Sequence, residues 1–141
     1  MINRAEPLRV LLVDDENYMR VFVGKVLSMY IKCTLEVARD GQEALARCQT
    51  GDPELIILDI NMPRLDGLQA LSEIRALKPD APIVMLTSIS EEAVVEECVT
   101  RGASYFIRKD VQAGLLKIEL ENMVRQFFPD ETETHEQSPT T

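Results

Sequence analysis

Two kinds of sequence pattern alternate along the 141-residue chain, and this alternation limits the fold more than any other feature. Short runs rich in Val, Ile and Leu predict five strands. Three of them are nearly continuous in apolar residues, which is typical of strands buried on both faces of a parallel sheet. The five runs are Leu8–Val13, Thr34–Val37, Leu55–Leu58, Ile83–Leu86 and Tyr105–Ile107.

The segments between these runs carry apolar residues at helical spacing. Asp40 and Ser90 stand where N-caps of two of the helices are expected, and Gly102 follows Arg101 as a stop signal for the fourth helix. Five successive β-then-α units imply right-handed crossovers. We therefore predict an α/β fold, a flavodoxin-like doubly wound sheet of five parallel strands in the order 2-1-3-4-5, with helices on both faces.

The last thirteen residues differ in composition from the rest of the chain. Residues 129–141 contain four acidic residues, no Lys or Arg, and no aliphatic or aromatic side chain. Such a segment cannot bury enough apolar surface to offset its ordering entropy. We predict one domain over residues 1–128 and an acidic disordered tail over 129–141.

Charge and hydropathy exclude several classes of function. The net charge of −9 would repel a phosphate backbone, and the chain has no cluster of Lys and Arg, so direct nucleic-acid binding is not expected. No apolar run is long enough to span a bilayer. The cysteines Cys33, Cys48 and Cys98 are far apart and form no CxxC motif, so they are read as small buried thiols in a reducing, cytoplasmic compartment.

Polar residues follow four of the predicted strands, at the point where each strand ends. Asp14 and Asp15 follow the first strand, Asp59 the third, and Thr87 the fourth, while the fifth leads into Lys109. Function in open α/β sheets collects at the carboxyl ends of the strands. In the 2-1-3-4-5 order these four strands are neighbours, so we expect three carboxylates, a hydroxyl and an ammonium to converge on one edge.

Convergent carboxylates limit the chemistry of that edge. Two unit charges about 4 Å apart repel by roughly 4 kcal/mol at an effective dielectric constant of 20, so three carboxylates need a cation, shared protons or separation. Mg²⁺ typically takes a few carboxylates together with waters and a phosphate oxygen. With Lys109 and a Thr hydroxyl it would form a phosphoryl clamp. Asp59 is then the expected nucleophile, and Asp14 and Asp15 the metal-holding pair.

The same residues resemble those of response-regulator receiver domains of two-component signalling, in particular the stand-alone, chemotaxis-regulator-like members. The resemblance covers about residues 8–127. Its blocks are Leu12-Val13-Asp14-Asp15-Glu16, Asp59-Ile60-Asn61-Met62-Pro63 through Asp66-Gly67, Thr87-Ser88, and Gly102-Ala103 ahead of Phe106 and Lys109. A stand-alone receiver or a receiver excised from a longer regulator would both look like this.

The resemblance implies a phosphorylation switch. Asp59 would accept a phosphoryl group from a histidine kinase or phosphotransfer protein. Mg²⁺ would be bound by Asp15, Asp59 and the Asn61 carbonyl, with Asp14 acting through water. Thr87 and Lys109 would contact the phosphoryl oxygens, and Thr87 and Phe106 would act as switch residues. Their movement would alter the surface formed by the fourth helix, fifth strand and fifth helix, which an as yet unknown downstream protein would read.

The sequence departs from the family pattern at two positions. Asp110 follows Lys109 where family members usually carry Pro in a cis peptide, so we expect either a trans bond or a strained cis bond there. Asp110 is also read as an N-cap for the fifth helix. Phe106 replaces the commoner Tyr and lacks its hydroxyl, so no hydrogen bond can fix its inward rotamer.

The fifth helix is predicted to be apolar on two sides. The residues expected to face the sheet are Leu116, Leu120, Met123, Val124 and Phe127, whereas Val111, Leu115 and Ile118 fall on the opposite side. A helix apolar on both sides usually buries both, which indicates a partner surface or a homodimer there. Tyr18 and Val21 on the first helix form a lesser patch where, by family analogy, a kinase or phosphotransfer domain would dock.

Two other functions remain open. A pseudo-receiver would make constitutive contacts that do not depend on phosphate. Asp110 is consistent with this alternative, because it places another carboxylate next to Lys109. A haloacid-dehalogenase-type phosphatase also uses a nucleophilic Asp, Mg²⁺, Thr or Ser and Lys. Its Asp-x-Asp signature would place an acid at the position of Asn61, which is not the case here.

Overall fold

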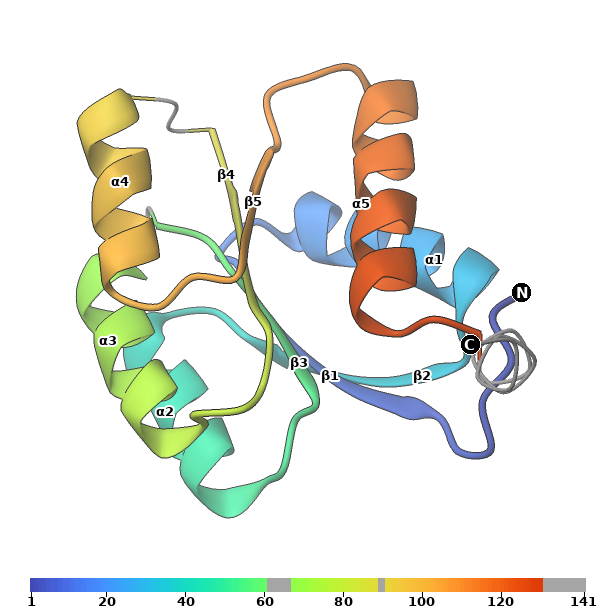
Figure 1. Cartoon of the computed structure of the whole chain (residues 1–141), viewed down its shortest axis with the longest axis horizontal. Helices are drawn as coiled ribbons and strands as arrows, with labels where there is room; N and C mark the ends of the chain where they lie inside the picture. The colour runs from blue at the N-terminus through green and yellow to red at the C-terminus, as the bar shows by residue number, and fades with distance from the viewer. Residues whose placement is uncertain (61–66, 89–90, 131–141) are drawn as a thin grey trace, which may run out of the picture.

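The computed structural model describes residues 1–60, 67–88 and 91–130, and it contains five strands that alternate with five helices (Figure 1). The strands are β1 (Leu8–Val13), β2 (Cys33–Ala38), β3 (Leu55–Leu58), β4 (Ile83–Thr87) and β5 (Tyr105–Arg108). The helices are α1 (Asn17–Tyr30), α2 (Gly41–Thr50), α3 (Gly67–Leu77), α4 (Glu92–Thr100) and α5 (Ala113–Phe127). Every predicted strand is present, within one residue at either end.

The sheet has the predicted topology. Its order is β2-β1-β3-β4-β5, and every neighbouring pair is parallel. In the register, Val13 lies beside Leu58, and Leu58 beside Met85. The strands β1, β3 and β4 therefore end within a few residues of one another, and the residues that follow them meet at one edge.

Successive residues of each central strand enter two different core layers. Figure 1 shows α1 and α5 on one face of the sheet and α2, α3 and α4 on the other. Leu12, Ile57 and Leu86 pack with α1 and α5, whereas Leu11, Ile56 and Met85 pack with α2, α3 and α4. Every residue of β3 and β4 is buried. Burial on both faces explains why these strands read as continuous apolar runs, and it makes the sheet a rigid base for the edge that it presents.

The helix ends agree only in part with the sequence signals. Asp40 caps α2, because its carboxylate accepts a hydrogen bond from the Glu43 backbone N–H at 2.9 Å. Gly102 follows α4 with φ +109°, a conformation that favours glycine. The predicted Ser90 cap lies outside the described residues, and the residue at the N-cap of α4 is Glu91, whose side chain makes no capping hydrogen bond.

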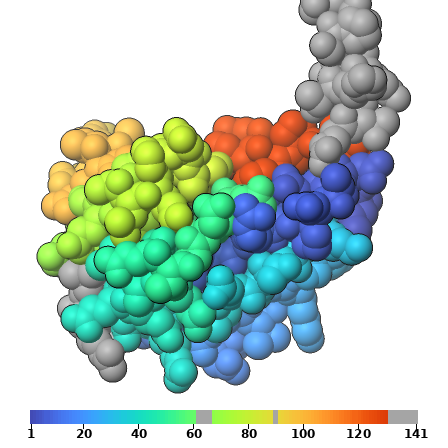
Figure 2. Space-filling view, turned by 90° about the horizontal axis from the view of Figure 1, so that it is seen from below, coloured from blue at the N-terminus to red at the C-terminus, as the bar shows by residue number. Residues whose placement is uncertain are grey.

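The N-terminal segment packs against the domain, which the sequence patterns did not predict. Ile2 is buried and forms an isolated parallel bridge with Ile31. Arg4 pairs with Glu54 at 3.2 Å and lies over the Phe128 ring, 5.7 Å from its centroid. Figure 2 shows this segment in dark blue beside the end of α5 in red. The contacts join the start of the chain to its last helix.

The predicted boundary between residues 1–128 and the tail 129–141 stays a prediction. Of the tail, only Pro129 and Asp130 are described, and the Asp130 carboxylate accepts a hydrogen bond from the Asn3 backbone N–H at 3.1 Å. Residues 131–141 lie outside the described part of the chain. Among the described helices, none combines the length and apolar character needed to cross a membrane.

The cysteines are free thiols, as predicted. Cys48 and Cys98 are buried, and burial raises the pKa of both thiols. Cys33 is only half-buried, because it lies on the edge strand β2, so the expectation of three buried thiols holds for two of them.

Two glycines give opposite predictions for substitution by alanine. A Cβ on Gly67 would clash with the Ile60 Cα and would lie 2.6 Å from the Asp59 carbonyl oxygen, so Gly67→Ala forces the backbone apart beside Asp59. We expect it to lower the free energy of unfolding by about 2 kcal/mol or more. Gly114 in α5 has nothing within 4 Å of its Cβ position, so Gly114→Ala is expected to raise that free energy by about 0.5–1 kcal/mol. Urea unfolding of both variants checks this, and equal effects would contradict it.

Candidate functional site

Two buried aspartates lie side by side at the carboxyl edge of the sheet. Asp14 directly follows β1 and Asp59 directly follows β3. The Asp14 backbone N–H donates to the Ala38 carbonyl at 3.0 Å, and that of Asp59 donates to the Val13 carbonyl at 3.1 Å. Because these bonds continue the ladders between neighbouring strands, the sheet itself fixes both backbones.

Lys109 reaches the same point from the end of β5. Its backbone N–H donates to the Thr87 carbonyl at 3.0 Å, which ties the residue to the end of β4. Its ammonium lies 3.1 Å from Asp14 Oδ2, 2.7 Å from Asp59 Oδ2 and 2.7 Å from Glu16 Oε1. The predicted convergence of carboxylates and an ammonium is therefore present in the structure.

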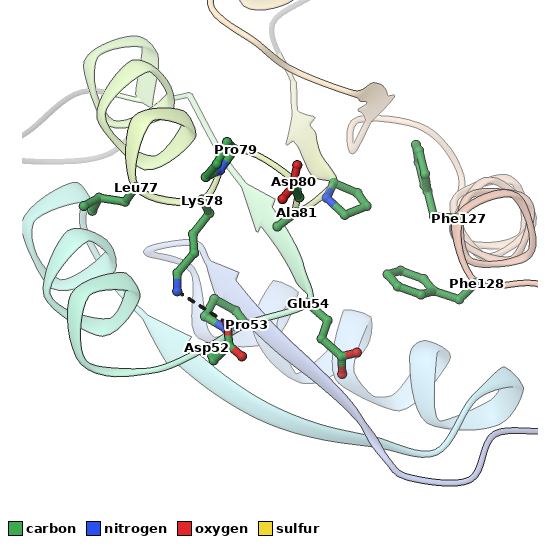
Figure 3. Close-up of a pocket in the computed structure, with 11 residues that line it drawn as sticks. Asp52, Pro53, Glu54, Leu77, Lys78, Pro79, Asp80, Ala81, Phe127 and Phe128 are labelled. Carbon is green, nitrogen blue, oxygen red and sulfur yellow. Dashed lines mark ion pairs between the residues drawn. The ribbon is translucent and has the colours of Figure 1, made fainter.

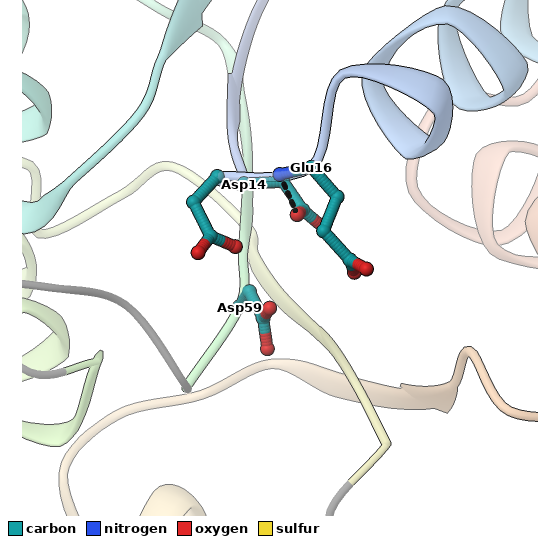
Figure 4. Close-up of side chains that lie close together, drawn as sticks. Asp14, Glu16 and Asp59 are labelled. Carbon is teal, nitrogen blue, oxygen red and sulfur yellow. Dashed lines mark hydrogen bonds between the residues drawn. The ribbon is translucent and has the colours of Figure 1, made fainter.

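Four carboxylates of the described residues gather around this point. Ligand atoms from Asp14, Asp15, Glu16 and Asp59 all lie within 4.8 Å of one another. Figure 4 shows Asp14 and Glu16 on the segment that leads into α1, and Asp59 at the end of the neighbouring strand. One ammonium cannot balance four negative charges, and hard oxygen ligands suit Mg²⁺. The donor set thus fits a divalent cation.

Glu16 was not singled out from the sequence as a site residue. It lies two residues after Asp14, and its backbone N–H donates to Asp14 Oδ1 at 2.9 Å. The available signal was an unbroken run of three acids directly after a buried strand. An acid at that position could equally have capped α1, so the run alone did not assign it to the site.

Burial and pairing act against each other on the ionisable groups. Burial raises the pKa of Asp14, with hydrogen bonds from the Glu16 backbone and the charge of Lys109 acting in the opposite direction. The hydrogen bond from Lys109 lowers the pKa of Glu16. Burial alone would lower the pKa of Lys109, but hydrogen bonds from its ammonium to Asp59 and Glu16 outweigh it and raise that pKa. Lys109 is therefore fully charged at neutral pH.

The other predicted site residues lie as follows. Thr87 is the last residue of β4 and is fully buried. Phe106 is half-buried on β5 and packs against the core layer of α2, α3 and α4. Asp15 is exposed at the rim of the carboxylate cluster. Asn61 lies outside the described residues.

The loop after Lys109 corrects one prediction. The Lys109–Asp110 peptide bond is trans, the first of the two forms expected. Asp110 does not cap α5, whose N-cap residue is Gln112. It forms instead a two-bond ion pair with Arg108, at 2.6 Å and 3.0 Å. A neighbouring guanidinium offers both carboxylate oxygens a charged donor, which a helix N-terminus cannot match.

The predicted partner surface on α5 is also altered. Leu115 and Ile118 are exposed, at 48% and 53%, whereas the sheet-facing side of the helix is buried as expected. Val111 does not join them. It precedes α5, is half-buried against the core, and lines a hollow of about 280 Å³ with Tyr18 and Lys109. The helical projection was wrong for Val111 because the helix begins only at Ala113.

The first-helix patch is exposed but divided. Tyr18 is 65% exposed and lines the hollow beside Lys109, between the starts of α1 and α5. Val21 is 48% exposed and lies toward β2, in a hollow with Leu35 and Val37. Of the two, only Tyr18 stands next to the carboxylate cluster.

A further hollow lies at the opposite end of the sheet (Figure 3). It has a volume of about 500 Å³ and is lined in part by Pro53, Pro79 and Phe128. Lys78 pairs with Asp52 across it at 3.5 Å. Most of its walls precede β3 and β4, and the rest lie at the end of α5, so it is separate from the carboxyl edge where Asp59 lies.

Comparison with known proteins identifies the class to which this fold and site belong. The model of the response regulator receiver domain matches residues 10–121, which is most of the chain. The chain therefore belongs to the response regulator receiver domain family of two-component systems. Receiver domains are signalling domains that act through phosphorylation. The resemblance stated from the sequence motifs is confirmed.

Individual relatives agree with this assignment. The chain is 31% identical over 118 residues to chemotaxis protein CheY of Listeria monocytogenes, covering 84% of this chain and 99% of CheY. It is 39% identical over 122 residues to protein-glutamate methylesterase/protein-glutamine glutaminase 3 of Rhodospirillum rubrum. That match covers 85% of this chain, which spans only about a third (32%) of that enzyme's length.

Among solved structures, the chain resembles one from the CheX–CheY–BeF3–Mg²⁺ complex of Borrelia burgdorferi. The TM-score is 0.75 at 27% identity, with 86% of this chain and 90% of that chain covered. The likeness confirms the CheY-like, flavodoxin-like fold that the strand order already shows.

Removing the Lys109 ammonium is expected to leave the repulsion between the neighbouring carboxylates unbalanced. Lys109→Met leaves Asp14 and Asp59 buried without their shared partner, so we expect the free energy of unfolding of the metal-free protein to fall by about 2–4 kcal/mol. Millimolar Mg²⁺ should recover part of the loss, because a ligand of the folded state stabilises it. Urea unfolding with and without Mg²⁺ measures both effects. Lys117→Met on α5 is the control, and an equal loss in that control would contradict the prediction.

Proposed function

We propose that this chain is a phosphorylation-activated signalling switch that accepts a phosphoryl group onto Asp59 from a histidine kinase or phosphotransfer protein. The observation that carries the proposal is the placement of Asp59. It is 2% exposed, lies among carboxylates able to hold a cation, and pairs with Lys109 at 2.7 Å. In a receiver domain, these are the surroundings that a phosphoryl acceptor needs.

The chemistry would be an in-line displacement at phosphorus. An Asp59 carboxylate oxygen attacks, and the phosphorus–nitrogen bond of the donor's phosphohistidine breaks with its electron pair going to the ring nitrogen. The imidazole leaves as a neutral group when its other ring nitrogen already carries a proton. Mg²⁺, when bound, supplies positive charge that offsets the charge of the phosphoryl oxygens. Lys109 supplies a second positive charge, and the Thr87 hydroxyl a hydrogen bond to a phosphoryl oxygen.

The residues proposed to hold Mg²⁺ are Asp15 and Asp59 directly, the Asn61 backbone carbonyl, and Asp14 through water. The carboxylate cluster supports three of the four. The BeF3 and Mg²⁺ in the Borrelia complex support the same kind of site, since beryllofluoride mimics a phosphoryl group.

The proposed output is a change in the surface of α4, β5 and α5. A phosphoryl group would add about 1.5 to 2 negative charges at Asp59. Thr87 would move toward it, and the half-buried Phe106, one strand away, would turn inward. A downstream protein or a second copy of the chain would then bind the altered face. The kinase or phosphotransfer protein would dock near Tyr18, beside Lys109.

Phosphorylation of Asp59 is tested by incubating the protein with Mg²⁺ and acetyl phosphate and recording its intact mass. We expect one added phosphoryl group in the wild type and none in Asp59→Asn. Beryllofluoride provides a second test. Adding it to the wild type should produce a spectral change of the protein only when Mg²⁺ is also present.

The outcomes separate the alternatives. Failure of both tests would favour a pseudo-receiver that acts through constitutive contacts. Steady turnover of a generic phosphate ester would instead favour the haloacid-dehalogenase-type phosphatase, which the family match does not support.

Assembly through α5 is tested by adding charge to its exposed apolar residues. Leu115→Glu with Ile118→Glu should weaken self-association, because burying a carboxylate in an apolar interface is costly. Asn122→Glu with Gln126→Glu adds the same charge to exposed positions of the same helix and is the matched control. Sedimentation velocity with and without beryllofluoride gives the oligomeric state. Equal association of both double variants would contradict an interface on this side of α5.

A further inference from the structure

Glu16 occupies a position that the backbone fixes from both sides. Its N–H donates to Asp14 Oδ1 at 2.9 Å, and its carbonyl accepts the first helical hydrogen bond of α1, from Arg20 at 3.1 Å. It is the N-cap residue of α1, with extended backbone angles (φ −96°, ψ 115°). The direction of its side chain is thus set by the end of β1 and the start of α1 (Figure 4).

The side chain does not do what an acid at a helix N-cap usually does. Such a carboxylate normally accepts a hydrogen bond from a backbone N–H of the first turn. Glu16 makes no capping hydrogen bond with its side chain. Its Oε1 instead lies 2.7 Å from the Lys109 ammonium, on a loop 93 residues further along the chain.

The Lys109 ammonium donates hydrogen bonds to three carboxylates, which have different proposed roles. Asp14 and Asp59 belong to the proposed cation and phosphoryl site, so both contacts change when that site is filled. Glu16 lies in the same carboxylate cluster but is not among the residues proposed to hold the cation or accept the phosphoryl group. It is the contact that can hold the ammonium in place while Asp59 reacts.

Asp110, the charged neighbour of Lys109 on the same loop, does not hold the Lys109 ammonium in place. Asp110, the next residue, pairs with Arg108, and both side chains are more than a third exposed. The Lys109 side chain is only 9% exposed and extends away from that pair toward β1. The tie from Glu16 therefore joins the loop after β1 to the loop after β5 across the site.

We propose that Glu16 is a positioning residue that holds the Lys109 ammonium beside Asp59 for phosphoryl transfer. This inference rests on the proposed function of Asp59. Besides Lys109, Tyr18 on the surface of α1 contributes to the lowered pKa of the Glu16 carboxyl. Glu16 acts on phosphoryl transfer through Lys109 and does not act as a ligand of the cation.

The kinetic test compares Glu16→Ala and Glu16→Gln with wild type in phosphorylation by acetyl phosphate, over a full range of Mg²⁺ and donor concentrations. Loss of one charge-assisted hydrogen bond predicts a maximal rate constant about fivefold lower for Glu16→Ala. Glu16→Gln, which keeps an acceptor oxygen, should lose about twofold. Glu36→Gln is the matched control, because it removes a glutamate that pairs with Arg47 far from Lys109. In a Lys109→Met background, Glu16→Ala should have no further effect.

A second measurement does not depend on phosphorylation. In ¹⁵N-labelled, metal-free protein, the hydrogen-bonded Lys109 ammonium should give a slowly exchanging resonance, assigned by its absence in Lys109→Met. Glu16→Ala should speed its exchange with water, and Glu36→Gln should not.

Each outcome has one meaning. A rate deficit in Glu16→Ala that disappears at saturating Mg²⁺ would make Glu16 a cation ligand and overturn the proposal. A faster rate in Glu16→Ala would show that Glu16 draws the Lys109 ammonium away from the phosphoryl group, and an equal loss in the Lys109→Met background would show that Glu16 does not act through Lys109. Either overturns it, as does an unchanged ammonium resonance. Absence of any Asp59 adduct in the wild type would be a failure of the proposed function, and the resonance would still report on the Glu16–Lys109 contact.

Discussion

The interaction on which the site depends is the repulsion among carboxylates that the sheet forces together. Parallel strands in this order place Asp14 and Asp59 at one edge, and backbone hydrogen bonds to Ala38 and Val13 hold them there. Neither group can withdraw, because each is buried. A mobile cation on a flexible stem is the simplest compensation, and Lys109 provides it. The site is thus electrostatically incomplete without its lysine and, on charge grounds, fits a divalent ion as well.

That arrangement requires a platform that does not yield. The central strands are buried on both faces, so separating Asp14 from Asp59 would disrupt two core layers at once. Close-packed cores resist such deformation. A change of charge at Asp59 is therefore more readily taken up at the ends of β4 and β5, where Thr87 and Phe106 lie, than within the sheet. The fold directs a local electrostatic event toward one side of the molecule.

The sequence predicts the fold and most of the site because both follow from periodicity. Continuous apolar runs mark the strands, and the residues directly after them must lie at one edge once the strand order is set. Thus Asp14, Asp59, Thr87 and Lys109 could be located without coordinates. The roles of these residues in phosphoryl transfer remain proposals that rest on the family and on chemistry.

The features that the sequence did not predict are contacts between residues that had more than one possible partner in the fold. Glu16 had two available partners, the α1 N-terminus and Lys109, and only the path of the chain shows that the lysine lies 2.7 Å away. Ile2 reads as one isolated apolar residue, and its burial depends on the closeness of Ile31. Val111 was placed on a helix that starts two residues later. Each of these outcomes required the tertiary arrangement, since the local pattern allowed more than one.

Asp110 shows how local geometry protects the site from a residue that could have disturbed it. A carboxylate next to Lys109 in sequence could compete with Asp59 for its ammonium. Arg108 is the last residue of β5, and its exposed guanidinium lies two positions before Asp110 in the chain. Asp110 consequently finds the Arg108 guanidinium at 2.6 Å, and Lys109 turns toward the carboxylates at the end of β1. Arg108 therefore neutralises the negative charge of Asp110 on the outer side of the loop, and the Lys109 ammonium stays available to Asp14 and Asp59.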